Sequence, residues 1–320
     1  MIAFLFPGQG SQRVGMGREL ADAFPLCRET FEDADAALGE PLSRVIFEGP
    51  EDRLTLTENA QPAILAVSIA ASRLLASRGI APSFVAGHSL GEYSANVAAG
   101  TFAFTDALRL VRRRGRYMQE AVPAGEGAMA AILGLDADRV AQACADAADG
   151  DVVSPANMNG AGQVVIAGSA GAVARAGERA KALGAKRVIP LSVSAPFHCA
   201  LMKPAQDRLA PELRALATST PRVPIVANVD AEPKRDAHAA IDALVAQVSS
   251  PVRWDAVVAR LASEGVTTYV EVGPGTVLSG LVRKMHRDAR VVSFGSPDTL
   301  AAVKDACARE GSRAVEARTR

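Results

Sequence analysis

The stretch FVAGHSLGEYSA, residues 84–95, is the most informative part of the chain, because it joins an apolar run to a helix through a sharp turn. Its centre has the pattern Gly-X-Ser-X-Gly, with glycines at positions 87 and 91 around Ser89. This pattern is typical of a nucleophile elbow, a strained strand-to-helix turn that exposes the serine oxygen close to backbone N–H groups. An ordinary tight turn can carry the same letters, so the rest of the chain must distinguish the two.

The composition limits the class of protein. The chain has 320 residues, of which 49% are hydrophobic and 22% charged, enough for one large domain or for one large and one small domain. A formal net charge of zero argues against a nucleic-acid binder that needs a global positive field. No apolar run reaches about 18 residues, so no membrane-spanning helix is expected.

Cysteine usage and the N-terminus indicate the compartment. The four cysteines are far apart and form no C-x-x-C pair, so neither a zinc site nor a disulfide framework is predicted. The apolar start MIAFLFPGQGSQ lacks the basic segment and the cleavage site of a signal peptide, and it predicts a first strand. We therefore expect a cytoplasmic protein that binds no metal, no nucleic acid and no membrane.

The order of apolar segments predicts an α/β fold built from two parts. Residues 1–126 and 195–300 alternate strands with helices, which favours a mostly parallel, doubly wound sheet. Residues 127–194 run strand, helix, strand, strand, helix, strand, which is the order of the ferredoxin-like split motif. We expect this segment to form an inserted subdomain and residues 301–320 to form a polar C-terminal tail.

A nucleophilic serine needs a base, and the chain has four histidines. His88 adjoins Ser89, and neighbouring strand side chains point to opposite faces, so His88 is interpreted as a structural turn residue. His238 and His286 lie in polar stretches and are expected to be solvated. His198 follows a predicted strand end and a proline, where it could converge on the elbow from elsewhere in the sheet. A buried histidine of the core is an equal alternative for His198.

An oxyanion hole is the third element of such a site. The N–H of Leu90 stands at the start of the helix that follows the serine, which makes it one candidate donor. The loop PGQGSQ, residues 7–12, places glycines on both sides of Gln9 and could turn a second N–H toward the elbow. A plain tight turn explains this loop equally well.

Seven short motifs occur together and in order along the chain. They are FPGQGSQ (6–12), QPAI (61–64), GHSLGEYSA (87–95), RRRGRYMQEA (112–121), FHCALMKPA (197–205), PVRW (251–254) and EVGPG (271–275). With them the chain resembles the malonyl-CoA:acyl carrier protein transacylases of type II fatty acid synthesis. It is also similar to the acyltransferase domains and stand-alone acyltransferases of polyketide synthases. The resemblance covers about residues 1–295 and implies an α/β-hydrolase-like core with an inserted ferredoxin-like (βαββαβ) subdomain.

The resemblance implies a role for each matching position around the nucleophile. Ser89 matches the residue that accepts the acyl group, and His198 matches the general base. The backbone N–H groups of Gln9 and Leu90 match the oxyanion hole. Gln247, upstream of PVRW, matches the residue whose backbone carbonyl orients the histidine.

The resemblance also implies how the acyl group is bound. Arg114 matches the arginine that pairs with the malonyl carboxylate, and Gln61 and Asn159 match residues that line the pocket. A buried carboxylate is costly unless it is paired, and the planar guanidinium pairs with it bidentately. Spacing alone would instead favour a solvated helix face for Arg114, since arginines surround it. Phe197 favours malonyl over methylmalonyl by crowding an extra methyl group, although it could also be an ordinary core aromatic.

The partner of His198 suggests a mild base. No acidic residue immediately precedes His198, and position 247 is a glutamine. A carbonyl partner fixes the imidazole tautomer but stabilises the imidazolium less than a carboxylate does. Such a base suits a thiol acceptor, which is more nucleophilic than water. We therefore expect Gln247→Glu to speed the release of malonate to water.

The sequence thus predicts a two-step transfer of malonyl from malonyl-CoA, through a malonyl-serine, to the phosphopantetheine thiol of an acyl carrier protein. No metal or redox cofactor is implied, and a monomer is expected. The alternatives are a serine hydrolase or thioesterase with the same elbow, a trans-acting polyketide acyltransferase, and a non-catalytic scaffold that docks a carrier protein. An acidic carrier protein would need a basic surface. Candidates, which equally suit ordinary solvated faces, are Lys186, Arg187, Arg283 and Lys284.

Overall fold

A computed structural model of the chain describes residues 1–308 and contains two sheets. The strands of the larger sheet are β1 (Ile2–Phe6), β2 (Phe84–Gly87), β7 (Ile225–Val226), β8 (Pro233–Lys234), β9 (Thr268–Val272) and β10 (Arg290–Phe294). They lie in the order β10-β9-β1-β2-β7-β8, and all neighbours are parallel except β7 and β8. Parallel strands need long crossovers, and the helices supply them.

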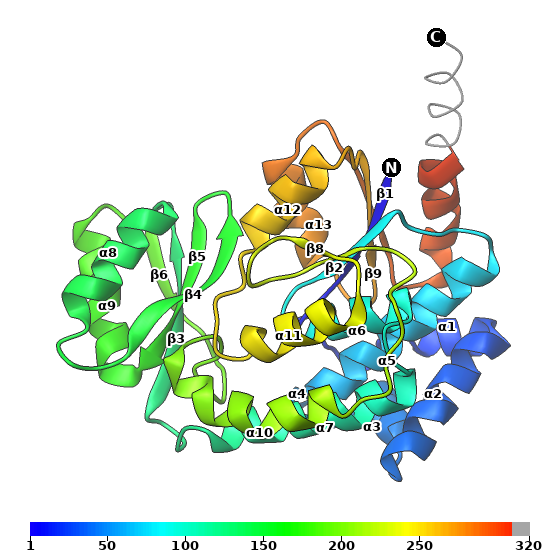
Figure 1. The fold of residues 1–320 in the computed structure, drawn as a ribbon, viewed down its shortest axis with the longest axis horizontal. Helices are drawn as coiled ribbons and strands as arrows, with labels where there is room; N and C mark the ends of the chain where they lie inside the picture. Colours follow the sequence, from blue (N-terminus) through cyan, green and yellow to red (C-terminus); the bar gives the residue numbers. More distant parts are fainter. Residues whose placement is uncertain (309–320) are drawn as a thin grey trace.

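Helices surround this sheet (Figure 1). Those before the insert are α1 (Arg18–Ala23), α2 (Pro25–Leu38), α3 (Leu42–Glu48), α4 (Glu51–Thr55), α5 (Thr57–Ser77), α6 (Leu90–Ala99) and α7 (Phe104–Glu120). Those after it are η1 (Ala200–Met202), α10 (Lys203–Arg214), α11 (Ala237–Gln247), α12 (Trp254–Ser263), α13 (Val277–Met285) and η2 (Pro297–Thr299).

The larger sheet lies between two hydrophobic cores, and successive side chains of β1 belong alternately to one and the other. Phe4 and Phe6 belong to the larger core, which includes the buried faces of α5 and α7. Ala3 and Leu5 point the other way, into a smaller core with Trp254 and other residues of α12 and α13. Because successive strand residues face opposite sides, both faces of the sheet are buried, as a doubly wound fold requires.

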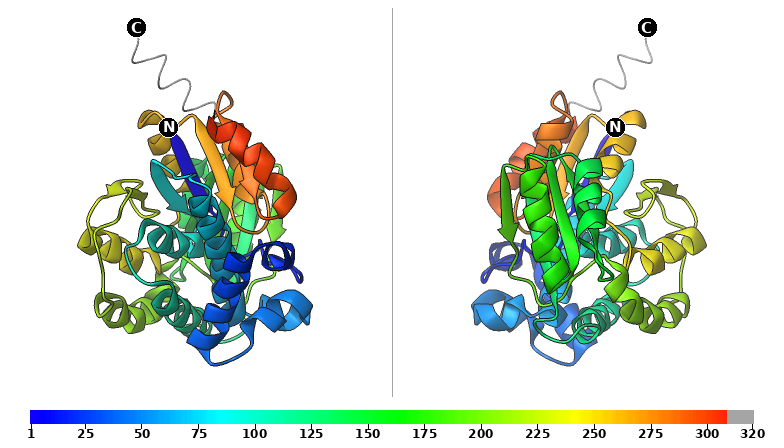
Figure 2. Two further views of the ribbon diagram at one scale, coloured as in Figure 1. Left: turned by 90° about the vertical axis from the view of Figure 1, so that its right-hand side faces the viewer. Right: turned by 90° about the vertical axis from the view of Figure 1, so that its left-hand side faces the viewer.

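The inserted segment folds as predicted. Its elements are β3 (Gly127–Leu133), α8 (Ala137–Ala147), β4 (Val153–Gly160), β5 (Gln163–Ser169), α9 (Ala170–Ala182) and β6 (Arg187–Pro190). The strands form an antiparallel sheet in the order β4-β5-β3-β6. The helices α8 and α9 pack together over one face of it around a separate core (Figure 2). The predicted α/β class, a mostly parallel sheet with a ferredoxin-like subdomain, is confirmed.

One expectation, that of a C-terminal tail, needs correction. Residues 300–308 are helical, and Val303 and Ala306 are buried against the core, so this part of the expected tail packs on the fold. The remainder, 309–320, lies outside the described residues. By length and composition alone, helix α5 would be able to cross a membrane. Because 78% of its apolar window is buried inside the fold, it has the properties of a core helix.

Candidate active site

Ser89 lies at a strained turn between β2 and α6. Its backbone has φ 53° and ψ −107°, a conformation that non-glycine residues rarely adopt. The flanking glycines explain why the turn can form. A Cβ atom at Gly87 would lie 2.0 Å from the carbonyl group of Gly91, and one at Gly91 would lie 1.9 Å from the carbonyl oxygen of Phe6. The turn therefore has the backbone geometry of a nucleophile elbow and packs against the end of β1.

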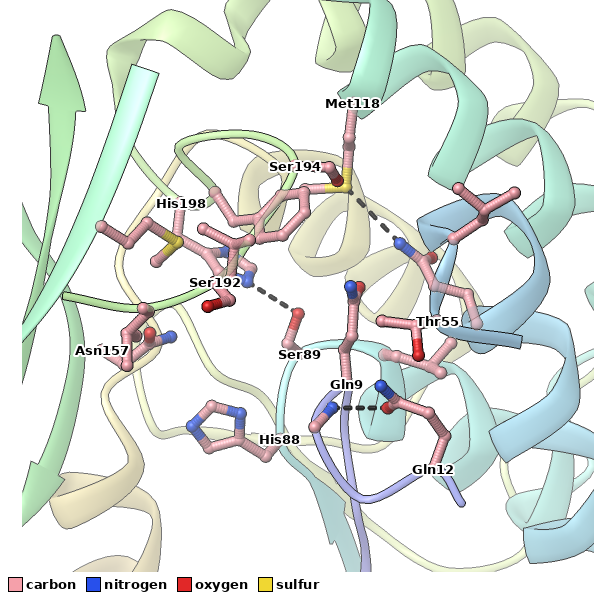
Figure 3. Close-up of a pocket in the computed structure, with 18 of the residues that line it drawn as sticks. Gln9, Gln12, Thr55, His88, Ser89, Met118, Asn157, Ser192, Ser194 and His198 are labelled. Atoms are coloured by element: carbon pink, nitrogen blue, oxygen red, sulfur yellow. Dashed lines mark hydrogen bonds between the residues drawn. The ribbon is translucent and has the colours of Figure 1, made fainter. Parts of the chain in front are cut away.

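His198 reaches this serine from the loop between β6 and η1. Its Nε2 lies 2.7 Å from Ser89 Oγ (Figure 3). Its Nδ1 lies 3.0 Å from the backbone carbonyl oxygen of Gln247. A carbonyl oxygen can only accept, so Nδ1 carries the proton and Nε2 presents its lone pair to the hydroxyl. Burial, followed by the charge of Arg114, lowers the pKa of His198 to about 3. The imidazole is therefore neutral and able to accept a proton.

Arg114 is fully buried beside the serine. Its Nη2 donates to Ser89 Oγ at 3.2 Å and to Gln247 Oε1 at 3.0 Å, and its Nη1 donates to Gln61 Oε1 at 2.8 Å. The guanidinium also stacks on the ring of Tyr93, 5.1 Å from its centroid. It forms no ion pair with any carboxylate in the described part of the chain. Burial lowers its pKa, and Tyr93 and the Glu92 carboxylate oppose this shift only in part.

Two residues with candidate backbone donors border the same cavity. Gln9, in the loop after β1, and Leu90, the first residue of α6, both line the cavity that contains Ser89. Within residues 1–308, neither N–H group donates to a protein acceptor. Free N–H groups at a helix start and in a neighbouring loop form a suitable site for a developing oxyanion.

The cavity has a volume of about 640 Å³, within the usual range for small-molecule sites. Its lining combines polar residues, among them Ser89, with apolar ones. The apolar residues of its lining include Leu56, Met118, Met129, Leu191, Val193 and Phe197. Gln61 lines it as predicted.

The structure changes the predicted role of one asparagine. Asn159 does not line the cavity; its Oδ1 lies 2.9 Å from Nε2 of His88. The asparagine that lines the cavity is Asn157, two positions earlier on β4. His88 also borders the cavity, and its ring lies against Trp254. His88 is thus more than a turn residue, since it and Asn159 form a wall behind the elbow.

The side chain of Gln247 points away from His198, which changes one expectation. Its Oε1 accepts from Arg114, and its Nε2 donates to the Ser89 carbonyl at 2.9 Å and to Glu92 Oε2 at 2.8 Å. Glutamate at this position would therefore place a second carboxylate against Glu92 and a counter-ion on Arg114. It would not reach His198 Nδ1, so the expected stronger base is not supported by this geometry.

Two buried polar residues beneath the elbow, Glu92 and Asn228, were not among the predicted site residues. Asn228 Oδ1 accepts from the Ser89 N–H at 2.8 Å, and its own N–H donates to Glu92 Oε2 at 3.0 Å. The available signal was a polar residue inside an otherwise apolar element, since Glu92 lies in LGEYSANVAA and Asn228 follows PIVA.

The remaining candidates lie away from the cavity. His238 is exposed, and His286 is half-buried with its Nδ1 3.0 Å from the hydroxyl of Tyr269. The four basic docking candidates are all exposed, on β6 and its preceding turn and on α13. Among residues 1–308, no group of three potential metal ligands lies together.

Comparisons with known proteins agree with this geometry. The model of the acyl transferase domain family matches residues 3–305. The malonyl CoA-acyl carrier protein transacylase of Escherichia coli (strain K12) is 51% identical over 302 residues, covering 94% of this chain and 98% of that protein. The crystal structure of an acyl carrier protein S-malonyltransferase from Vibrio cholerae has a TM-score of 0.93 and 48% identity, covering 94% of this chain and 99% of that one.

A further solved structure contains a carrier protein. It is a type II polyketide synthase acyl carrier protein in complex with its malonyl-transacylase. The match has a TM-score of 0.92 and 48% identity, and it covers 94% of this chain and 97% of that one.

Proposed function

This chain belongs to the acyl transferase domain family, and from that premise we propose that it transfers malonyl from malonyl-CoA to the phosphopantetheine thiol of an acyl carrier protein. The observation that carries the proposal is Arg114. Within residues 1–308 this buried guanidinium forms no ion pair, and it lies 3.2 Å from Ser89 Oγ, which supports an acyl group that ends in a carboxylate.

The first half-reaction forms a malonyl-serine. Ser89 Oγ attacks the thioester carbon while His198 Nε2 takes the hydroxyl proton. The N–H groups of Gln9 and Leu90 hold the oxyanion, and each such donor typically contributes about 10²–10³ in rate. The C–S bond then breaks, and the proton on His198 passes to the departing coenzyme A thiolate.

The second half-reaction repeats these steps with the carrier protein. His198 takes the proton of the phosphopantetheine thiol, the thiolate attacks the malonyl ester, and Ser89 Oγ leaves with that proton. Every group in this scheme belongs to the chain or its substrates, so we propose that no metal or redox cofactor takes part. We also propose a monomer that acts in the cytoplasm.

Intact mass spectrometry tests the proposal directly. After mixing with malonyl-CoA, the protein should gain the mass of one malonyl group, and Ser89→Ala should gain none. Adding an acyl carrier protein should remove the adduct and acylate the carrier. If no adduct forms, or if it persists in Ser89→Ala, the proposed function is wrong.

Two alternative functions differ from this proposal in the molecule that accepts the acyl group. A serine hydrolase would pass the acyl group to water, but a base oriented by a carbonyl favours a thiol acceptor. A trans-acting polyketide acyltransferase would prefer polyketide carriers, and a malonyl-transacylase of that pathway is among the structures similar to this chain. Competition of malonyl-, methylmalonyl- and acetyl-CoA for fatty-acid and polyketide carrier proteins separates these cases. Phe197, in the cavity wall, should disfavour methylmalonyl.

A further inference from the structure

A carboxylate lies behind the nucleophile and takes no part in the chemistry above. Glu92, in the first turn of α6, is 1% exposed and forms no ion pair within the described chain. Its Oε2 accepts two hydrogen bonds, one from the Asn228 backbone N–H at 3.0 Å and one from Gln247 Nε2 at 2.8 Å. Burying such a group is costly, so its two partners are the natural place to look for its role.

Both partners of Glu92 hold the backbone of Ser89. Asn228 Oδ1 accepts from the Ser89 N–H at 2.8 Å, and Gln247 Nε2 donates to the Ser89 carbonyl at 2.9 Å. Asn228 Nδ2 also donates to the carbonyl of Gly87 at 2.8 Å. These side chains therefore satisfy both polar backbone groups of the residue with φ 53°, a conformation that persists only when its surroundings fix it.

Gln247 also forms hydrogen bonds with His198 and Arg114. Its carbonyl accepts from His198 Nδ1 at 3.0 Å, and its Oε1 accepts from Arg114 Nη2 at 3.0 Å. A shift of Gln247 would move the base and the guanidinium together. Displacements of about 1 Å at such groups can lower a rate by about 10²-fold.

We propose that Glu92 is a positioning residue: its carboxylate fixes Asn228 and Gln247, and through them it holds the strained Ser89 and aligns His198. Glu92 touches no reacting atom. The reaction it serves is the proposed acyl transfer, but the alignment of Ser89 and His198 does not depend on the identity of the acyl group.

Two substitutions at Glu92 separate its hydrogen-bonding role from its volume. Leucine is similar in size but accepts no hydrogen bond, so Glu92→Leu should lower kcat for malonyl transfer by about 10-fold to 150-fold. KM for malonyl-CoA should change by less than about threefold, because Glu92 makes no contact with the substrate. Glutamine keeps one acceptor oxygen in nearly the same place, so Glu92→Gln should recover most of the lost kcat.

A second buried carboxylate provides the matched control. Glu271, fully buried on β9, accepts from the backbone N–H groups of Leu278 and Ser279 at 3.0 and 2.7 Å, and so holds the start of α13. Glu271→Gln should lower the melting temperature and leave kcat per folded molecule unchanged. If Glu92→Leu shows only this pattern, with kcat per folded molecule retained, then Glu92 is merely structural and the inference is wrong.

A reagent that needs no malonyl group separates this inference from the proposed function. A fluorophosphonate should label Ser89, and Glu92→Leu should slow that labelling about as much as it lowers kcat, with Glu92→Gln again intermediate. Equal labelling rates in all three proteins would overturn the positioning role, even if malonyl transfer is observed. Labelling that depends on Glu92, in a protein that never forms a malonyl adduct, would support the positioning role and reject the proposed reaction.

Discussion

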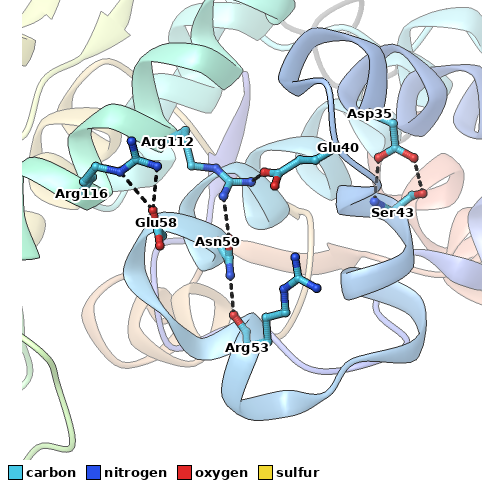
Figure 4. A network of polar contacts seen from close by, with 8 residues as sticks. All are labelled: Asp35, Glu40, Ser43, Arg53, Glu58, Asn59, Arg112 and Arg116. Carbon is cyan, nitrogen blue, oxygen red and sulfur yellow. Dashed lines mark hydrogen bonds and ion pairs between the residues drawn. The ribbon is translucent and has the colours of Figure 1, made fainter.

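Arg112 and Arg114 lie two positions apart on α7 and have opposite surroundings. Arg112 joins a network in which the protein itself supplies the counter-charge (Figure 4). Its Nη2 pairs with Glu40, and its Nη1 donates to Asn59 Oδ1 at 2.7 Å. Asn59 in turn donates to the backbone carbonyl of Arg53 at 2.7 Å, which ties α7 to α4 and α5.

Arg114 is more deeply buried and yet lacks a counter-charge. Its side chain is among the largest fully buried ones, whereas that of Arg112 is 14% exposed. The acceptors of Arg114 are two side-chain amides and the serine hydroxyl, all neutral. The carboxylate that acts on Arg114, Glu92, is joined to it only through Gln247 and forms no ion pair with it within residues 1–308. A buried cation of this kind favours a carboxylate ligand on its cavity side. Arg112 stabilises the fold, and Arg114 is available for a carboxylate in the cavity.

The largest expected effect comes from removing the uncompensated cation. Arg114→Ala should lower kcat/KM for malonyl-CoA by about 10-fold to 150-fold, because a charge-assisted contact of about 1.5–3 kcal/mol is lost. An uncharged acyl-CoA such as acetyl-CoA has no carboxylate to lose, so its transfer should not fall in proportion. The measurement is the ratio of kcat/KM for the two thioesters.

The matched control is Arg112→Ala. Its guanidinium faces Glu40 and Asn59 and does not line the cavity, so the malonyl-to-acetyl ratio should stay within about twofold of the wild type. An equal change in the ratio for both variants would mean that the two arginines do not differ in the way the geometry indicates.

The second prediction concerns the free energy of unfolding. Replacing the less buried arginine, Arg112, should cost more stability than replacing the more buried Arg114. Methionine can fill much of the volume of either arginine. Arg112→Met leaves the Glu40 carboxylate and the Asn59 amide without their partner, and should lower the unfolding free energy by about 1–2 kcal/mol. Arg114→Met removes a buried cation that forms no ion pair in the described chain, and this relief offsets the lost hydrogen bonds to Gln61 and Gln247. It should therefore lower the unfolding free energy less, despite the greater burial. Urea denaturation of both variants checks the order, and a larger loss for Arg114→Met would contradict it.

The two arginines also show which parts of the site the sequence could predict and which it could not. The elbow was predictable because its reason is local: glycines at 87 and 91 leave room that no Cβ would have. The residues around Arg114 could not distinguish a buried from a solvated arginine, since Arg112, Arg113 and Arg116 are equally basic. Its environment is set by partners 53 and 133 positions away in sequence. Only the resemblance to a family indicated the role of Arg114.

The error at Asn159 has a physical cause on β4. In a regular strand, residues 157 and 159 would share one face. The pairing of β4 with β5 shifts register between Pro155 and Asn157 and again between Met158 and Gly160. Such irregularities re-aim side chains and leave no clear trace in the sequence, so Asn157 borders the cavity while Asn159 supports His88. The supporting pair Glu92 and Asn228 was missed for a related reason, because its contacts span 136 positions.

A third prediction uses a free dicarboxylate. Malonate should bind the cavity through Arg114 and raise the melting temperature of the wild type and of Arg112→Ala. At ten times its Kd, a ligand adds about 1.4 kcal/mol of stability. The shift should disappear in Arg114→Ala, because that variant has no buried cation to pair with the carboxylate. Malonamide, which is uncharged, is the control compound and should stabilise none of the three proteins.

The smallest expected effect is a change in the pKa of His198, which the positive charge of Arg114 helps to lower. The pKa of His198 is lowered from 6.5 to about 3, mainly by burial and next by Arg114. Arg114→Gln should therefore move the pKa of His198 upward, toward its ordinary value, while Arg112→Gln should not, since Glu40 neutralises that charge. Titration of the labelled His198 ring by NMR measures this directly.

The same shift has a consequence for stability, with a definite sign. Between pH 6.5 and 3 the unfolded chain binds a proton at His198 that the native protein does not, so acidification through this window destabilises the fold. The contribution is at most about 1.4 kcal/mol per pH unit. Arg114→Gln raises the pKa of His198 in the native protein, so the pH range over which only the unfolded chain binds the proton becomes narrower. On acidification toward pH 3, this variant should therefore lose less stability than the wild type. Arg112→Gln, whose charge was already compensated, should follow the wild-type slope. If both variants changed the slope alike, the charge of Arg114 would not be acting on the base.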